Sequence, residues 1–203
     1  MSYSIGKALN YMGLKDPLDY CTYYVYGKAR CYAQPYINTD FNVSKINDNL
    51  YIGDFPSACN KEELQNLGIT HIVTAVIGVE PMFPDDFKYQ LVDICDTKTT
   101  EISLYFDECS KFIDEAIEGK GKVYVHCMCG VSRSATIIAA YLIYKYKYTD
   151  EDSIAVLKAC RDCVDPNPGF RRQLKIYSDY INNQGKNLVN PQINANNDTL
   201  ITV

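Results

Sequence analysis

One stretch near the middle of the chain limits the fold more than any other. Residues 122–126 (KVYVH) form a short apolar run, residues 127–132 (CMCGVS) are rich in small side chains, and residues 134–147 (SATIIAAYLIYKYK) are apolar on nearly every face. A helix that is apolar all round lies at the centre of a domain. A short β-branched run before it is typical of a buried strand. The stretch therefore predicts a central strand, a tight turn and a buried helix.

Further strands and helices alternate around this stretch. The β-branched runs at 49–54, 70–77 and 89–94 predict strands. Helices are expected over 61–68, 100–119 with Thr100 as N-cap, 151–161 and 170–181. Interleaved strands and helices predict an α/β fold with a central mixed or parallel β-sheet flanked by helices, in which loop 127–132 joins the central strand to the buried helix.

The chain divides into three parts by composition. Residues 1–45 form a tyrosine-rich extension, residues 46–181 a domain of alternating strands and helices, and residues 182–203 an asparagine-rich tail that is expected to be disordered. The aromatic side chains of the extension need a surface to pack on. Two arrangements are open: the extension packs on its own domain, or it packs on a second copy in a homodimer. The tyrosines concerned include Tyr20, Tyr23, Tyr24, Tyr26, Tyr32 and Tyr36.

Composition argues against several classes of protein. A net charge of −5 disfavours nucleic acid as a partner, and no apolar run approaches the length of a membrane span. The N-terminal residues do not resemble an export signal, so the expected location is the cytoplasm, with nuclear entry left open, and the nine cysteines are expected to stay thiols. The spacing of cysteines and of the two histidines does not fit a zinc site, and we expect neither metal nor cofactor.

The turn after the central strand is suited to bind an anion. Backbone N–H groups in such a turn converge, and the start of a helix near Arg133 adds partial positive charge. Gly130 permits the tight backbone path. The thiolate of Cys127 would be stabilised there, and the Arg133 guanidinium matches two oxygens of a tetrahedral oxyanion. A thiolate nucleophile in this setting indicates phosphoryl transfer through a cysteinyl-phosphate.

Three motifs resemble one enzyme family. HCMCGVSRS resembles the signature loop of the cysteine-dependent protein phosphatases, and its second half resembles that of the dual-specificity branch. Asp96 lies 31 residues before Cys127, as the general acid of that family does. INDNLYIGDFPSA with LQNLGITHIV, and RDCVDPNPGFRRQL, resemble the opening and closing segments of the family's domain. The resemblance covers roughly residues 46–181.

The resemblance implies a role for each matching residue. Cys127 would be the nucleophile, Arg133 the phosphate clamp, Asp96 the general acid and then base, and Ser134 the group that helps the thiolate leave. His126 would support the loop, and Asn167 would tie the closing segment to it. Phosphate would lie against Met128, Cys129, Gly130, Val131, Ser132 and Arg133. Asp93 is the alternative to Asp96.

The activity implied is that of a dual-specificity protein phosphatase acting on phosphoproteins at phosphotyrosine and at phosphoserine or phosphothreonine. Alternatives are a phospho-binding module without turnover, and a lipid or RNA 5′-phosphatase of the same superfamily. The loop has no lysine and the chain is acidic, which disfavours polyanionic substrates. Three points are open: whether Arg161 contacts a second phosphate or only solvent, what Thr74 contacts where the family commonly has asparagine, and whether Cys95 or Cys129 captures an oxidised Cys127 as a disulfide.

Overall fold

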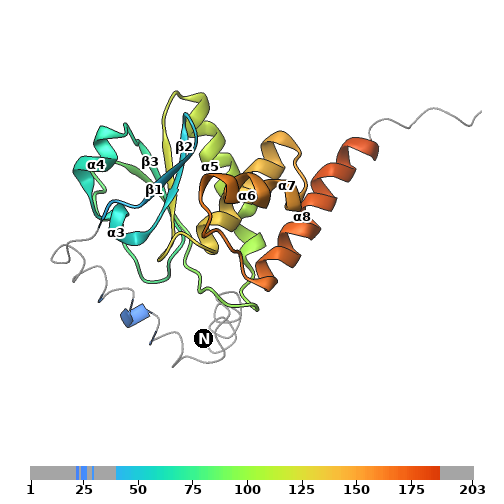
Figure 1. Cartoon of the computed structure of the whole chain (residues 1–203), viewed down its shortest axis with the longest axis horizontal. Helices are drawn as coiled ribbons and strands as arrows, with labels where there is room; N and C mark the ends of the chain where they lie inside the picture. Colours follow the sequence, from blue (N-terminus) through green and yellow to red (C-terminus); the bar gives the residue numbers. More distant parts are fainter. Residues whose placement is uncertain (1–21, 23, 27–28, 30–39, 188–203) are drawn as a thin grey trace, which may run out of the picture.

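The structure is a computed structural model that describes residues 22, 24–26, 29 and 40–187 (Figure 1). The sheet contains β1 (Val43–Asn47), β2 (Leu50–Gly53), β3 (His71–Thr74), β4 (Lys88–Leu91) and β5 (Val123–His126). The helices are α3 (Phe55–Ala58), α4 (Lys61–Asn66), the 3₁₀ helix η2 (Ile102–Tyr105), α5 (Phe106–Glu118), α6 (Arg133–Tyr146), α7 (Asp150–Cys160) and α8 (Pro168–Asn187).

The described strands form one sheet in the order β1-β2-β5-β3-β4. β5 is central and pairs in parallel with β2 and β3, β4 pairs in parallel with β3, and β1 is antiparallel to β2. In sheets of this kind ligands bind outside the carboxyl ends of the parallel strands. The loop that follows β5 therefore lies where such sheets place their sites.

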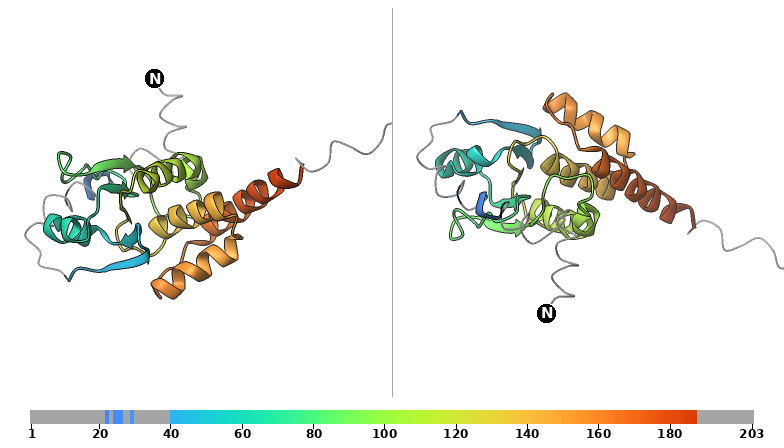
Figure 2. Two further views of the ribbon diagram at one scale, coloured as in Figure 1. Left: turned by 90° about the horizontal axis from the view of Figure 1, so that it is seen from above. Right: turned by 90° about the horizontal axis from the view of Figure 1, so that it is seen from below.

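Alternating side chains give the sheet two buried faces. Val123 and Val125 point into the larger apolar cluster, whereas Tyr124 between them points into the smaller one. Helices α5 to α8 lie on the side of the larger cluster, and α3 and α4 lie on the other (Figures 1 and 2). The sheet is thus covered on both sides, which confirms the predicted α/β class with its central sheet flanked by helices.

Helix α6 forms the centre of the larger layer. Every residue from Ser134 to Ile143 is buried, and α5, α7 and α8 all pack against the helix. A helix surrounded on all sides has no polar stripe, which explains why this segment is apolar on every face. Lys147 ends α6 in the left-handed conformation, with φ of 59°.

Several boundaries differ from those predicted. Thr100 is not an N-cap: its side chain is buried and its Oγ1 donates to the carbonyl of Cys95 at 2.9 Å, and the chain enters α5 through η2 instead. β3 and β4 end at Thr74 and Leu91, earlier than expected, and β1 was not predicted. α8 continues to Asn187, so residues 182–187 belong to this helix rather than to the tail.

Part of the N-terminal extension is described. Residues 22, 24–26 and 29 are helical. The predictions for Tyr20, Tyr23, Tyr32 and Tyr36 and for the tail 188–203 concern residues outside the described part of the chain. No helix in the described part of the chain is long and apolar enough to cross a membrane.

Candidate active site

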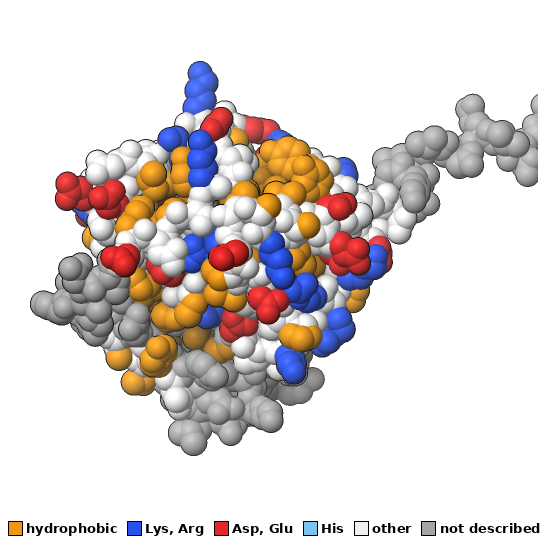
Figure 3. Space-filling view, in the orientation of Figure 1, with side chains coloured by type: hydrophobic (Ala, Val, Ile, Leu, Met, Phe, Trp, Pro, Cys, Tyr) orange, Lys and Arg blue, Asp and Glu red, His pale blue; other side chains and the backbone are white. Residues whose placement is uncertain are grey.

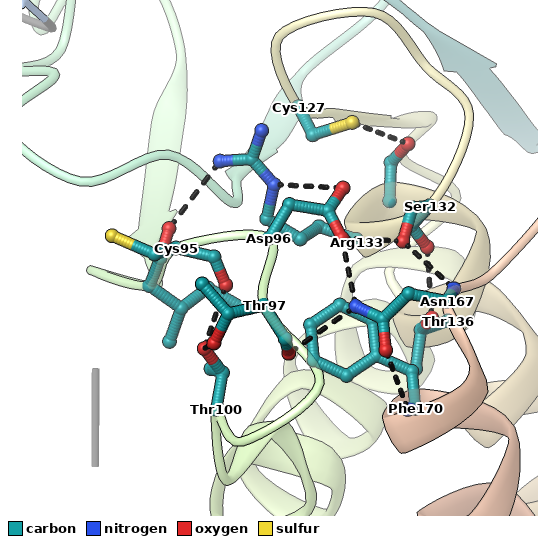
Figure 4. A network of polar contacts seen from close by, with 12 residues as sticks. Cys95, Asp96, Thr97, Thr100, Cys127, Ser132, Arg133, Thr136, Asn167 and Phe170 are labelled. Atoms are coloured by element: carbon teal, nitrogen blue, oxygen red, sulfur yellow. Dashed lines mark hydrogen bonds and ion pairs between the residues drawn. The ribbon is translucent and has the colours of Figure 1, made fainter. Parts of the chain in front are cut away.

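The loop 127–132 connects β5 to α6 and surrounds the side chain of Cys127 (Figure 4). All six of its carbonyl groups accept hydrogen bonds from outside the loop or from the helix after it. His126 Nδ1 donates to the carbonyl of Cys127 (3.2 Å), Phe55 N to that of Met128 (3.2 Å) and Asp165 N to that of Val131 (2.9 Å). Arg161 donates through Nη2 to Cys129 (3.4 Å) and through Nε to Gly130 (3.0 Å). Thr136 donates to Ser132 through its backbone N (2.9 Å) and its Oγ1 (2.8 Å).

This pattern fixes the direction of the loop's N–H groups. In a trans peptide the N–H points opposite to the C=O, and the described chain has no cis peptide bond. Carbonyl groups that are bonded outward therefore leave the N–H groups directed inward. Gly130 shows the result, because its N–H donates to Cys127 Sγ at 3.3 Å. Its φ of +70° is a left-handed conformation that favours glycine.

The Cys127 thiol lies in a setting that favours the thiolate. Burial alone would raise the pKa of this thiol, but the charge of Arg133 lowers it. Hydrogen bonds from the side chain and backbone of Ser134 and from the backbone of Cys129 act in the same direction, and the net effect is a lowered pKa. Ser134 Oγ donates to Cys127 Sγ at 3.3 Å. The surroundings of Cys127 thus favour the thiolate, which is the nucleophilic form of cysteine.

Arg133 presents an unused donor to the centre of the site. Its Nη1 donates to the carbonyl of Ile94 at 3.3 Å, which holds the guanidinium in place. Its Nε is buried and has no hydrogen-bond partner within the described residues. A buried donor without a partner is costly, so this N–H is available for an oxyanion that enters the loop.

Asp96 faces Arg133 from the loop that follows β4 (Figure 4). Its Oδ1 accepts hydrogen bonds from Ser132 Oγ and Asn167 Nδ2, both at 2.8 Å. Its Oδ2 lies 3.6 Å from Arg133 Nε. One carboxyl oxygen is therefore fixed by the protein, and the other is directed at the position of a bound anion.

The alternative carboxylate, Asp93, has a different setting. Its Oδ1 accepts from the backbone N–H of Gly78 at 3.3 Å. A cavity of about 230 Å³ beside the loop is lined by Asp96 and not by Asp93. The full lining is Tyr26, Val76, Ile77, Cys95, Asp96, Met128 and Arg133. This geometry favours Asp96 over Asp93 as the proton donor.

Asn167 joins three parts of the site. Its backbone N–H donates to Ser132 Oγ at 3.2 Å, and its side-chain Nδ2 holds Asp96. Its Oδ1 accepts from the backbone N–H groups of Gly169 and Phe170, which caps the start of α8. The predicted tie between the closing segment and the loop is present. The contacts of Ser132 and Asn167 with Asp96 were not predicted.

Comparisons with known proteins agree with this geometry. The family model described as "Dual specificity phosphatase, catalytic domain" matches residues 50–180. Dual specificity protein phosphatase 1B of Arabidopsis thaliana is 37% identical over 151 residues, which covers 74% of this chain and 90% of that protein. Dual specificity protein phosphatase 1 of the same plant is 44% identical over 137 residues, covering 67% and 69%. The crystal structure of DUSP15 matches with a TM-score of 0.66 and 31% identity, covering 73% and 97%.

The chain belongs to the dual-specificity phosphatase family. It is a protein phosphatase, a hydrolase that acts on phosphoproteins. Among the residues that the structure describes, no cluster of three or more His, Cys, Asp or Glu side chains is arranged to hold a metal ion.

His126 of the phosphatase is a neutral support for the loop. Burial lowers its pKa to about 4, so the ring carries one proton at neutral pH. Because the Cys127 carbonyl can only accept, that proton is on Nδ1, and Nε2 accepts from the Thr74 hydroxyl at 2.9 Å. Thr74 thus contacts the ring of His126, which in turn bonds the first carbonyl of the loop, and this answers the question that the replacement of asparagine raised.

The sequence left two roles open for Arg161, and the structure shows contacts that neither of them foresaw. The residue is only 5% exposed and its guanidinium bonds protein atoms, so it is not a solvated arginine at the end of a helix. A contact with a second phosphate stays a prediction. Besides two loop carbonyls, Arg161 donates through Nη1 to Asn42 Oδ1 at 2.8 Å and to Ser44 Oγ at 3.3 Å. A Cβ on Gly130 would approach Arg161 Nη2 to 2.8 Å. Arg161 is therefore a positioning residue for the phosphate loop.

We expect Arg161→Ala to lower kcat/KM for an aryl phosphate roughly 10²-fold, comparable to the loss of one oxyanion-binding donor. The carbonyls of Cys129 and Gly130 would lose their outward partner, and the N–H groups would no longer be held toward Cys127. The acidic limb of the pH–rate profile should shift to higher pH, because the thiolate loses stabilisation. Arg172→Ala, at an exposed position of α8, is the control. An Arg161→Ala enzyme with a normal pH profile would show that the residue only stabilises the fold.

The neutral state of His126 predicts a pH dependence of stability. Its folded pKa of about 4 lies below the ordinary value of 6.5, so the unfolded chain binds the proton more readily. Stability is therefore fully present above pH 6.5 and falls as the pH drops toward 4, by up to about 3 kcal/mol. Compared with the wild type, denaturant unfolding should lose most of this slope in His126→Gln. His71→Gln is the control and should lose less of it, because the pKa of His71 is also lowered by burial but the larger shift, to about 4, is that of His126. Equal slopes in all three would refute the neutral assignment.

Proposed function

We propose that the phosphatase works through a cysteinyl-phosphate formed on Cys127. The thiolate attacks phosphorus while the guanidinium of Arg133 and the inward N–H groups bind the phosphoryl oxygens. The P–O bond to the substrate side chain breaks, and Asp96 Oδ2 gives its proton to the departing oxygen. The observation that carries this proposal is the arrangement of Arg133 Nε, which is buried, has no hydrogen-bond partner and lies 3.6 Å from Asp96 Oδ2.

The second step follows with the roles reversed. Asp96, now a carboxylate, accepts a proton from water as the water oxygen attacks phosphorus. The S–P bond breaks, inorganic phosphate leaves, and the thiolate of Cys127 is restored. Ser134 Oγ, 3.3 Å from Sγ, stabilises the departing thiolate by a hydrogen bond. Cys127 and Asp96 thus take part in both steps, with their roles reversed in the second.

Phosphotyrosine, with phosphoserine and phosphothreonine, is the substrate class that we infer. The cavity of about 230 Å³ is smaller than the roughly 300–1,000 Å³ of sites for drug-sized ligands, so it suits one phosphorylated side chain. A phospho-binding module without turnover would need neither the lowered pKa of Cys127 nor a positioned Asp96. A lipid or RNA substrate is disfavoured because acidic and basic side chains are mixed over the face seen in Figure 3.

We also propose a location for the phosphatase and a position for its extension. Cys109, Cys127, Cys160 and Cys163 carry thiols rather than disulfides, which supports a reducing compartment such as the cytoplasm. Tyr24 and Tyr26 of the extension lie against the catalytic domain, which favours the first of its two predicted arrangements. A homodimer through the extension stays a prediction.

Cys127→Ser should abolish hydrolysis of an aryl phosphate, because an un-ionised hydroxyl cannot replace the thiolate. Phosphate binding should persist, since the outward bonds of the loop carbonyls do not involve the Cys127 side chain. Steady-state assays and calorimetric binding of phosphate measure the two effects, and vanadate should inhibit the wild type. Cys163→Ser, at an exposed position, should behave as wild type. Turnover by the Cys127→Ser enzyme near the wild-type rate would rule out the covalent route.

Asp96→Asn should lower kcat on phosphotyrosine by roughly 10²–10⁴, the usual contribution of a general acid. The fold should be unaffected, because the amide oxygen of Asn can still accept from Ser132 and Asn167. The loss should shrink for an aryl phosphate whose leaving group needs no proton. Asp93→Asn is the matched control and should retain activity. If Asp93→Asn shows the large, leaving-group-dependent loss instead, the general acid has been assigned to the wrong carboxylate.

A further inference from the structure

The N-terminal extension contacts the catalytic domain at a glycine. A Cβ on Gly78 would come within 2.8 Å of the Tyr24 carbonyl oxygen and 3.1 Å of its Cα, so the backbone of the extension lies directly on this residue. Gly78 has a φ of +73°, and its N–H donates to Asp93. It follows Val76 and Ile77, which line the catalytic cavity. The extension is thus seated beside the entrance to the site.

Tyr26 is one of the residues that line that cavity. Its side chain lines the same space as Asp96 and Arg133, although it precedes them by about 70 and 107 residues of the sequence. The residue is 54% exposed, so part of it stays open to solvent. The other apolar lining residues are Val76, Ile77 and Met128. The lining therefore combines a charged part, Asp96 and Arg133, which we call the floor, with an apolar part, which we call the walls and which includes one aromatic residue.

The length of a substrate side chain decides whether it contacts the walls as well as the floor. The phosphate of phosphotyrosine lies at the far end of a phenyl ring, so the ring must occupy the space between the apolar walls when the phosphate reaches the floor. Phosphoserine and phosphothreonine have no group to fill that space. Aromatic pairs attract each other beyond the effect of buried area alone. An aromatic wall can therefore contact the phenyl ring of phosphotyrosine, whereas phosphoserine and phosphothreonine offer it no ring.

We propose that Tyr26 is a substrate-binding residue that contacts the phenyl ring of phosphotyrosine and makes the phosphatase prefer phosphotyrosine over phosphoserine and phosphothreonine. This inference rests on the proposed function, because it requires phosphate to bind at Cys127 and Arg133. It gives the tyrosine-rich extension a role in specificity: part of the recognition surface comes from outside the family domain, which the family model places at residues 50–180.

The test compares two peptides that differ only in carrying phosphotyrosine or phosphothreonine. Tyr26→Ala should lower kcat/KM for the phosphotyrosyl peptide about tenfold, through KM, because a contact made equally in ground and transition states affects binding. The value for the phosphothreonyl peptide should change less than twofold. Tyr26→Phe should keep the preference, since it retains the ring. Val25→Ala is the control, because Val25 is 63% exposed and does not line the cavity.

Vanadate, a phosphate mimic without a phenyl ring, is a reference for binding to the floor of the site alone. Its inhibition constant should be the same for wild type and Tyr26→Ala, because it fills only the floor of the site. This constant replaces the phosphothreonyl value if that peptide is turned over too slowly. Equal losses on both substrates, a weaker vanadate inhibition, no change, or a gain of activity on phosphotyrosine would each overturn the inference. Failure of the proposed function would look different: the wild type itself would hydrolyse neither peptide and would not respond to vanadate.

Discussion

The outward hydrogen bonds of six carbonyl groups are the interaction on which the site depends. A turn of six residues has as many acceptors as donors, and an anion binds only if the acceptors face away from it. Distant parts of the fold bond four of these acceptors: α3 holds Met128, the end of α7 holds Cys129 and Gly130, and the segment after α7 holds Val131. The phosphate loop therefore takes its shape from the assembled domain rather than from its own residues.

Arg161 connects strand β1, which was not predicted, to the active site. A buried guanidinium is costly unless its donors are satisfied, and the two loop carbonyls do not use all of them. The remaining ones reach Asn42, next to β1, and Ser44 within it. β1 pairs with β2 and thus completes the shell around the arginine. The same side chain links the sheet edge, the end of α7 and the phosphate loop. A substitution that displaces one of these parts should therefore also displace the other two.

The sequence predicted what depends on local patterns and missed what depends on distant contacts. The central strand, the buried helix α6 and the placement of Cys127, Gly130 and Arg133 follow from a continuous stretch with strong periodicity and one glycine. The buried state of Arg161, the bonds from Ser132 and Asn167 to Asp96, and the position of Tyr26 join residues separated by 30 to more than 70 positions. Thr100 was misread because Ser, Thr, Asp and Asn bond loops as readily as helix ends.

The two oxygens of Asp96 have different tasks, and this division orders the reaction. Oδ1 already accepts two hydrogen bonds, so a proton is best accommodated on Oδ2, the oxygen beside Arg133 Nε. In the proposed mechanism this is the proton that passes to the departing oxygen in the first step. Once the leaving group has departed with that proton, the carboxylate is the base that the second step needs.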